Sequence, residues 1–184
     1  MSAPGFVLWF TGLPAAGKST LARALQQRLA AAGIGSQLLD SDELRRRLTP
    51  QPTYSAAERD WFYDMVVFLA DLLAQNGVNV LIAATAPRRR YRTAARRVLP
   101  RFAEIFVDCP VDLCRERDPK QLWQRAAAGD IDNLPGAGAP YEPPEAPELR
   151  LNSADLSPDA AVDRLLHTLR ELAFIPPLRL SDFA

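Results

Sequence analysis

Phe6-Val7-Leu8-Trp9-Phe10 leads, one residue later, into Gly12-Leu13-Pro14-Ala15-Ala16-Gly17-Lys18-Ser19-Thr20. The apolar run is typical of a strand that is buried on both faces of a parallel sheet. The glycine-rich segment fits G-x-x-x-x-G-K-[ST] in full, and leucines then recur every four residues from Leu21 to Leu29, as in a helix. A strand, a glycine-rich turn and a helix in this order predict a phosphate-binding loop and a nucleoside triphosphate ligand.

Each part of this loop has a chemical task. The glycines permit a tight turn in which backbone N–H groups face phosphate oxygens, and the following helix adds its positive dipole end. Lys18 is expected to reach the β- and γ-phosphates of ATP, and the Ser19 hydroxyl to ligate Mg²⁺. The expected nucleotide-binding residues are Gly12, Ala15, Ala16, Gly17, Lys18, Ser19 and Thr20.

Apolar runs and helical patterns alternate along the rest of the chain. Strands are expected at residues 36–39, 78–83, 102–108 and 149–151, and helices at 54–75, 89–99 and 158–172. This alternation indicates an α/β fold of the nucleoside-triphosphate-binding type, with a parallel five-stranded sheet flanked by helices. One domain is expected over residues 1–173, followed by a C-terminal tail over 174–184.

Residues 129–148 hold five of the 16 prolines and three of the nine glycines. Some 20 residues without regular structure are uncommon inside a compact domain and are often a lid or binding loop. A disordered surface excursion would have the same composition. We interpret the segment as a lid.

Two carboxylates, Asp40 and Asp42, follow the expected second strand. Ligands of open α/β sheets collect at the carboxyl ends of strands. One carboxylate can hold a water of Mg²⁺, and the other can accept the proton of an attacking hydroxyl. We assign metal binding to Ser19 and Asp40, and contact with the attacking hydroxyl to Asp42, although the two carboxylates could exchange these roles. The alternative is that the acidic residues only stabilise a helix N-terminus, where the helix dipole favours negative charge. Together with Lys18, Asp40 and Asp42 are the expected catalytic residues.

The overall composition excludes several other classes of protein. The 184 residues carry 22 basic and 22 acidic side chains, which argues against a broadly basic nucleic-acid binder. No segment approaches the roughly 20 apolar residues of a membrane span, and the N-terminus lacks a signal-peptide pattern. Two cysteines are too few for a disulfide framework, so a reducing cytoplasm is expected. A small kinase fits better than a switch GTPase, because neither lysine lies in an N-K-x-D-type motif.

Several strings in the chain resemble the adenylylsulfate kinase family, over about residues 6–172. Asp40, Asp42 and Arg45 match a D-G-D-x-x-R element, and residues 54–59 match F-S-x-x-D-R. The most specific matches come later, in Phe106-Val107-Asp108-Cys109-Pro110, Cys114, Arg117-Asp118-Pro119-Lys120 and Pro140-Tyr141-Glu142-Pro143-Pro144.

This resemblance implies transfer of the γ-phosphoryl group of ATP, with Mg²⁺, to the 3′-hydroxyl of adenosine 5′-phosphosulfate (APS). The lid would exclude water, which competes as phosphoryl acceptor. By resemblance, Arg45 and Arg59 bind the phosphosulfate, Tyr54 stacks on the adenine, and Lys120 faces phosphate. The implied substrate-binding residues are Asp42, Arg45, Tyr54, Arg59, Phe62, Lys120 and Leu134. A homodimer, and association or fusion with ATP sulfurylase, are also implied.

Several positions differ from the family pattern, among them Tyr63 and Met65 in place of an isoleucine and an arginine, and all of them lie on the acceptor side. Ser41 replaces a glycine, Phe62 an asparagine, Asp64 an arginine, Ala86 a serine and Leu134 an aromatic residue. Two alternatives therefore stay open. One is a kinase of the same scaffold that phosphorylates a different small hydroxyl compound, and the other is a nucleotide-binding domain with weakened acceptor turnover.

Lysine is almost absent from the chain. Twenty of the 22 basic residues are arginine, and the only lysines are Lys18 and Lys120. Arginine often replaces lysine on a solvated surface but not where a compact point charge must fit a phosphate cradle. The pattern predicts that both lysines serve the nucleotide.

Overall fold

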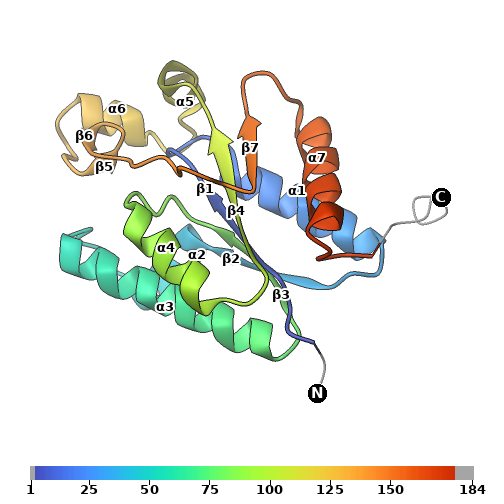
Figure 1. Cartoon of the computed structure of the whole chain (residues 1–184). Helices are drawn as coiled ribbons and strands as arrows, with labels where there is room; N and C mark the ends of the chain where they lie inside the picture. Colours follow the sequence, from blue (N-terminus) through green and yellow to red (C-terminus); the bar gives the residue numbers. More distant parts are fainter. Residues whose placement is uncertain (1–2, 177–184) are drawn as a thin grey trace.

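A computed structural model describes residues 3–176 (Figure 1). Its main sheet has five parallel strands in the order β2-β3-β1-β4-β7. These strands are β1 (Val7–Thr11), β2 (Ser36–Asp40), β3 (Asn79–Ala83), β4 (Phe102–Asp108) and β7 (Leu149–Asn152). The expected α/β fold with a parallel five-stranded sheet is confirmed.

Helices cover both faces of this sheet (Figure 1). Helices α1 (Lys18–Ala31) and α7 (Pro158–Glu171) pack on one face, and α3 (Ala56–Gln75) and α4 (Arg89–Val98) pack on the other. Three shorter helices lie beyond the carboxyl ends of the strands or beside them. They are α2 (Ser41–Leu48), α5 (Val111–Arg117) and α6 (Leu122–Ala127).

Strand β1 lies at the centre of the molecule and explains the apolar run that opens the chain. Phe6, Leu8 and Phe10 belong to the core that contains α1 and α7. Val7 and Trp9 belong to the opposite core, with α3 and α4. All five side chains are fully buried. A strand that is covered on both faces has no polar side, so its sequence does not alternate.

The long helix α3 begins at Ala56 rather than at Tyr54 as the apolar pattern predicts. Ser55 is its N-cap, and its hydroxyl accepts a hydrogen bond from the backbone N–H of Glu58 at 3.2 Å. Tyr54 has a φ of 54°, which no helix of L-residues continues. The other expected elements agree with the structure to within one or two residues at each end.

The predicted lid segment contains two very short strands, β5 (Leu134–Pro135) and β6 (Gly138–Ala139). At the other end, Phe174 stacks on Phe6 with ring centroids 5.7 Å apart, and Ile175 is buried. Core packing thus includes the first residues of the predicted tail. Residues 177–184 of that tail lie outside the described part of the chain.

Candidate active site

A cleft of about 1070 Å³ opens at the carboxyl ends of the strands. The phosphate-binding loop forms its floor, and the start of α2 and the segment around α6 form its walls. Most predicted site residues line it, namely Ala15, Ala16, Gly17, Lys18, Ser19, Thr20, Asp40, Asp42, Arg45, Tyr54, Arg59, Lys120 and Leu134. Gly12 and Phe62 are the two predicted site residues that do not line the cleft.

The phosphate loop has the backbone geometry that its glycines allow. Gly17 has a φ of 100° and is the N-cap of α1, so the chain can turn into the helix with its first N–H groups at the cleft. At Gly12, with φ 151°, a Cβ atom would lie 2.4 Å from the carbonyl oxygen of Val107 on β4. Gly12 is therefore required by close packing against the neighbouring strand.

Lys18 points back across this loop. Its Nζ donates hydrogen bonds to the carbonyl oxygens of Gly12 at 3.0 Å and Leu13 at 2.8 Å. Burial lowers the pKa of Lys18 to about 8, and the charge of Asp42 opposes that shift. Because burial disfavours the charged form of Lys18, an incoming phosphate would stabilise its ammonium group strongly.

Asp40 is buried at the end of β2 and makes two structural contacts. Its Oδ1 accepts from the backbone N–H of Asp42 at 3.0 Å, which makes Asp40 the N-cap of α2. Its Oδ2 is 3.2 Å from Arg23 of α1. The alternative interpretation of the acidic pair, in which the carboxylates stabilise a helix N-terminus, therefore applies to Asp40, which caps α2.

Asp42 lies in the first turn of α2, with its side chain 58% exposed, and forms an ion pair with Lys120. The same carboxylate has the largest charge effect on Lys18, and Lys120 acts on Lys18 with the opposite sign. The two lysines of the chain therefore flank one carboxylate in the cleft. Both lysines of this arginine-rich chain thus line the cleft.

The predicted acceptor side is a cluster of arginines and aromatic rings. The guanidinium of Arg45 lies 4.8 Å from the ring centroid of Tyr54, and that of Arg59 lies 5.5 Å from the same ring. Arg45 also donates to Glu58 at 2.9 Å. Burial raises the pKa of Glu58, but hydrogen bonds from Thr53 and the charge of Arg45 outweigh burial and lower it overall.

The positions that differ from the family pattern have distinct environments. Ser41 starts helix α2 without a positive φ, so no glycine is required there. Phe62 is fully buried, and Leu134 is buried at the edge of the cleft. Ala86 has a φ of 41°, and its backbone N–H donates to the hydroxyl of Tyr63 at 3.0 Å.

The lid segment and the helix before it, α6, pack directly on the phosphate loop. Trp123 of α6 donates from its indole N–H to the carbonyl oxygen of Pro14 at 3.2 Å. A Cβ atom on Gly136 would lie 2.7 Å from the Leu13 side chain, and Arg59 donates to the carbonyl oxygen of Asn133 at 2.9 Å. This segment thus joins the phosphate loop to the acceptor side.

Asp118 holds the bend of the chain between α5 and α6, which precedes the lid segment. Its carboxylate accepts from the backbone N–H groups of Leu122 at 2.9 Å, Trp123 at 2.8 Å and Gln124 at 3.1 Å, and so caps the N-terminus of α6. Lys120 lies in the loop that this cap closes. The position of its side chain beside Asp42 therefore depends on the bend that Asp118 holds.

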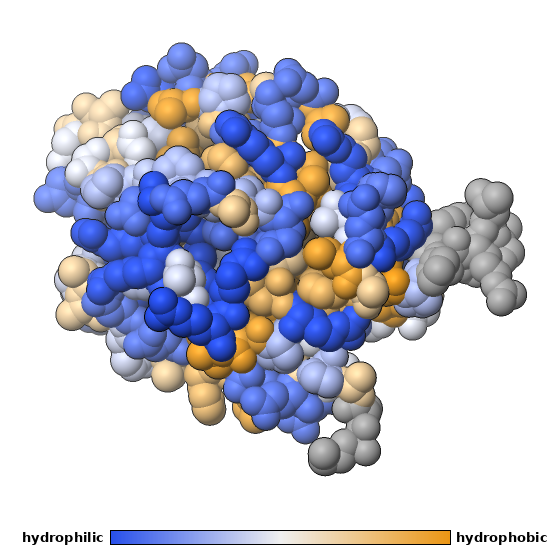
Figure 2. Space-filling model, viewed as in Figure 1, coloured by the Kyte–Doolittle hydropathy of each residue, from blue (hydrophilic) through white to orange (hydrophobic). Residues whose placement is uncertain are grey.

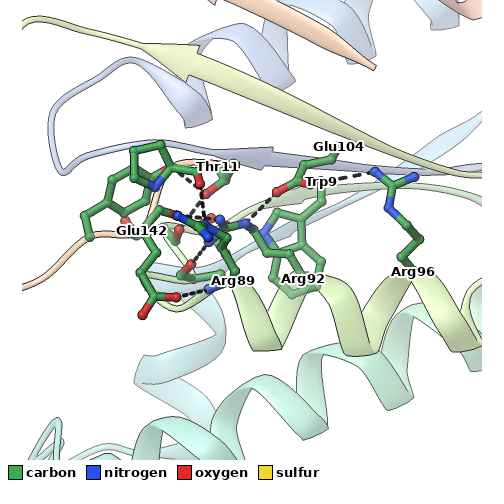
Figure 3. A network of polar contacts seen from close by, with 12 residues as sticks. Trp9, Thr11, Arg89, Arg92, Arg96, Glu104 and Glu142 are labelled. Carbon is green, nitrogen blue, oxygen red and sulfur yellow. Dashed lines mark hydrogen bonds and ion pairs between the residues drawn. The ribbon is translucent and has the colours of Figure 1, made fainter. Parts of the chain in front are cut away.

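A buried polar network anchors the far end of the lid (Figure 3). Arg92 of α4 binds Glu104 of β4 and donates to the carbonyl oxygen of Glu142 at 2.6 Å. The hydroxyl groups of Tyr141 and Thr11 are 3.0 Å apart, so the segment is also tied to the residue before the phosphate loop. Burial raises the pKa of Tyr141 to about 12, so this hydroxyl stays neutral.

The run of arginines around α4 is mostly a solvated helix face, as its charge pattern indicates. Figure 2 shows a hydrophilic area over this helix. Arg89 pairs with Glu145, Arg90 with Asp60, and Arg96 with Glu148. The apolar stretches of the helices between residues 3 and 176 include none that is suited to span a membrane.

Arg23 and Tyr63 are among the cleft residues that were not predicted from the sequence. Arg23 lies four residues after Ser19 on α1, so helical spacing places it on the same side of the helix and could have indicated it. Tyr63 lines the cleft and binds the backbone of Ala86, but it reads as one more aromatic core position in the sequence.

Comparison with known proteins identifies the family to which this chain belongs. The family model described as adenylylsulphate kinase matches residues 4–152. The chain belongs to the adenylylsulfate kinase family. An adenylyl-sulfate kinase from Synechococcus sp. (strain JA-3-3Ab) is 38% identical over 175 residues, which cover 95% of this chain and 99% of the relative.

Two further relatives of this family member bear on its site and its assembly. The structure of Mycobacterium tuberculosis APS kinase CysC in complex with AMPPNP and APS has a TM-score of 0.87, is 36% identical, and covers 92% of this chain and 99% of that one. A probable bifunctional SAT/APS kinase 2 from Sorangium cellulosum is 37% identical over 172 residues, which cover 94% of this chain but 30% of the relative.

Proposed function

We propose that this family member transfers the γ-phosphoryl group of ATP to the 3′-hydroxyl of APS. The observation that carries the proposal is one cleft with a phosphate loop at its floor and an arginine-aromatic cluster at its acceptor side. A nucleoside triphosphate suits the phosphate loop, and an anionic adenosine compound suits the arginine-aromatic cluster.

Lys18 and the loop N–H groups would stabilise the charge of the transferring phosphoryl group. Asp42 is our assignment for the carboxylate that accepts the proton of the 3′-hydroxyl, because its side chain is exposed at the cleft, whereas Asp40 is buried and its two oxygens bind Asp42 and Arg23. Lys120, beside Asp42, would contact phosphate oxygens of the reacting nucleotides.

The donor set fits Mg²⁺. Ser19 offers a hydroxyl and Asp40 a buried carboxylate at the same cleft, and Mg²⁺ prefers few protein oxygens together with waters and substrate phosphates. No group of three or more metal-binding side chains is found among residues 3–176, which agrees with a metal held largely by the nucleotide. Ser19 and Asp40 would hold the ion, which would supply positive charge to offset that of the nucleotide phosphates.

The contacts of α6 and the lid segment with the cleft suggest how water would be excluded during phosphoryl transfer. Trp123 and Gly136 lie against the phosphate loop, and Arg59 binds the lid backbone from the acceptor side. A cover in these positions would separate the reacting oxygen from bulk water, which otherwise accepts the phosphoryl group.

A coupled assay of ADP release tests this function against the two alternatives. We expect rapid release with APS at low micromolar concentration and loss of release in Lys18→Ala, with the far-ultraviolet circular dichroism of that variant unchanged. Release with another small hydroxyl compound, but not with APS, would support the different-acceptor kinase. ATP binding without release for any acceptor would support the nucleotide-binding domain.

We also propose that the enzyme is a homodimer that uses the outer face of α3. Trp61, Phe68 and Leu72 lie on one face of this helix and are 45%, 58% and 53% exposed. Sedimentation velocity should give a dimer for the wild type and a monomer for Phe68→Glu. A monomeric wild type at micromolar concentration would contradict the proposal.

Association with a sulfurylase is the remaining proposal about partners. It is supported by the Sorangium relative, whose name joins an SAT activity to an APS kinase in a longer chain. We further place the enzyme in a reducing cytoplasm, in keeping with the free thiols of Cys109 and Cys114. Co-purification from the native host, with the sulfurylase identified by mass, tests the association.

A further inference from the structure

Phe62 lies against Arg45, at the position where the family pattern has an asparagine. The centre of the guanidinium is 3.8 Å from the centroid of the Phe62 ring, closer than its 4.8 Å to Tyr54. Phe62 is fully buried and packs edge-on against Tyr63, with ring centroids 5.4 Å apart. The core therefore fixes this ring, and a face of the ring meets the charge of Arg45.

Arg45 is a charged residue with little contact with water. It is 8% exposed, and within residues 3–176 its carboxylate partner is Glu58, at 2.9 Å from Nη1. Glu58 is itself held by the hydroxyl of Thr53 at 2.7 Å. A guanidinium is weakly hydrated and stacks well on aromatic faces. A ring can thus hold Arg45 without using any of its N–H donors, whereas an asparagine would compete for them.

We propose that Phe62 is a positioning residue that holds the Arg45 guanidinium in place for the anionic phosphosulfate of the acceptor. The inference rests on the proposed function for the identity of that acceptor. Phe62 does not line the cleft, whereas Arg45 does, so Phe62 acts on the acceptor only through Arg45. The loss of the family asparagine then changes how the arginine is held and leaves its charge at the cleft.

The position of the pair predicts which substrate is affected. Arg45 lies with Tyr54 and Arg59 on the proposed acceptor side of the cleft. If Arg45 is poorly positioned, the binding of APS should therefore weaken and the binding of ATP should be unchanged. A general loss of structure would weaken both.

Phe62→Leu is the central variant, because it keeps an apolar side chain and removes the ring. We expect the KM for APS to rise about 5- to 30-fold, in line with a desolvated cation–π contact, while the KM for ATP and kcat change less than about twofold. Phe62→Tyr, which keeps the ring face, should stay within about twofold of the wild type for APS.

Val66→Ala is the matched control. Val66 is fully buried one turn further along α3 and belongs to the same core cluster as Phe62. This variant should lower the melting temperature and leave the KM for APS unchanged. An equal rise of the KM for APS in Val66→Ala and Phe62→Leu would overturn the proposal, as would an unchanged KM in Phe62→Leu.

A magnetic resonance measurement separates this inference from the proposed function. The Nε–H resonance of Arg45, assigned by its loss in Arg45→Lys, should carry a ring-current shift that disappears in Phe62→Leu. If the wild type does not phosphorylate APS, the proposed function fails, but this resonance still decides whether Phe62 holds Arg45. A resonance that is the same in wild type and Phe62→Leu would overturn the positioning role.

Discussion

The carboxylate of Asp42 on α2 forms an ion pair with the ammonium group of Lys120, 78 residues later in the chain. This contact joins the acidic element after β2 to the loop before α6. Asp42 also acts on the charge of Lys18, so the phosphate loop and the lid base meet at one carboxylate.

Lys120→Arg tests whether a compact charge is required beside Asp42. An arginine is larger and spreads its charge over a planar fork, so it should fit this position poorly. We expect kcat/KM for ATP to fall about tenfold or more, the equivalent of losing roughly 1.4 kcal/mol of transition-state binding. Arg164→Lys, on an exposed part of α7, is the control and should have no effect. Unchanged turnover and ATP affinity in Lys120→Arg would show that lysine at 120 is a coincidence of composition.

The pH dependence of nucleotide binding tests the environment of Lys18. Its pKa of about 8 lies below its ordinary value of 10.5, so the free protein loses this charge as the pH rises through 8. A bound phosphate favours the charged form, so affinity for an ATP analogue should fall as the pH rises above 8.

Asp42→Asn sharpens this measurement. The charge of Asp42 raises the pKa of Lys18, so its removal should move the fall in affinity to lower pH. Calorimetric titration of the analogue between pH 6 and 10 measures both proteins without requiring turnover. A fall that begins at the same pH in both would contradict the effect of the Asp42 charge on the pKa of Lys18.

The cap formed by Asp118 should matter for stability and for the lid. Asp118→Ala removes the acceptor of three backbone N–H groups of α6 and should lower the free energy of unfolding by about 1–3 kcal/mol. Because Lys120 lies in the loop that the cap closes, the KM for ATP should also rise. Glu116→Ala, which removes an exposed carboxylate on α5, should do neither. Urea denaturation and initial rates check the two effects.

Arg92 tests the anchor at the other end of the lid. Arg92→Met leaves the buried carboxylate of Glu104 without its closest partner and should cost about 3–5 kcal/mol of stability. Arg97→Met, on the exposed side of the same helix, should change stability by less than about 0.5 kcal/mol. Equal midpoints of urea unfolding for the two variants would show that Arg92 is not an anchor.

The sequence was enough to predict the strands and the phosphate loop because their signals are local. Five apolar residues ahead of a glycine-rich turn allow few alternatives, and Lys18 and Ser19 follow from the motif itself. Helices α5 and α6, at seven and six residues, are too short to show a helical period. Their positions depend on distant contacts such as that of Trp123 with Pro14.

The acceptor side shows the same limit more clearly. The family pattern pointed to position 62, but nothing local to Phe62 reveals that its ring meets Arg45, 17 residues earlier. The ion pair of Asp42 with Lys120 also joins separate elements. In the composition, only the scarcity of lysine indicated that Lys120 has a particular role. Contacts between distant residues follow from the fold and not from their neighbours in sequence.

The most direct measurement is the identity of the product formed from ATP and APS. After incubation with Mg²⁺, mass spectrometry and phosphorus magnetic resonance should find ADP and one new nucleotide that carries its added phosphate on C3′ of the ribose. No such product should form in Lys18→Ala. An unmodified APS pool, or a phosphate attached at any other position, would contradict the assignment of this cleft to 3′-phosphorylation.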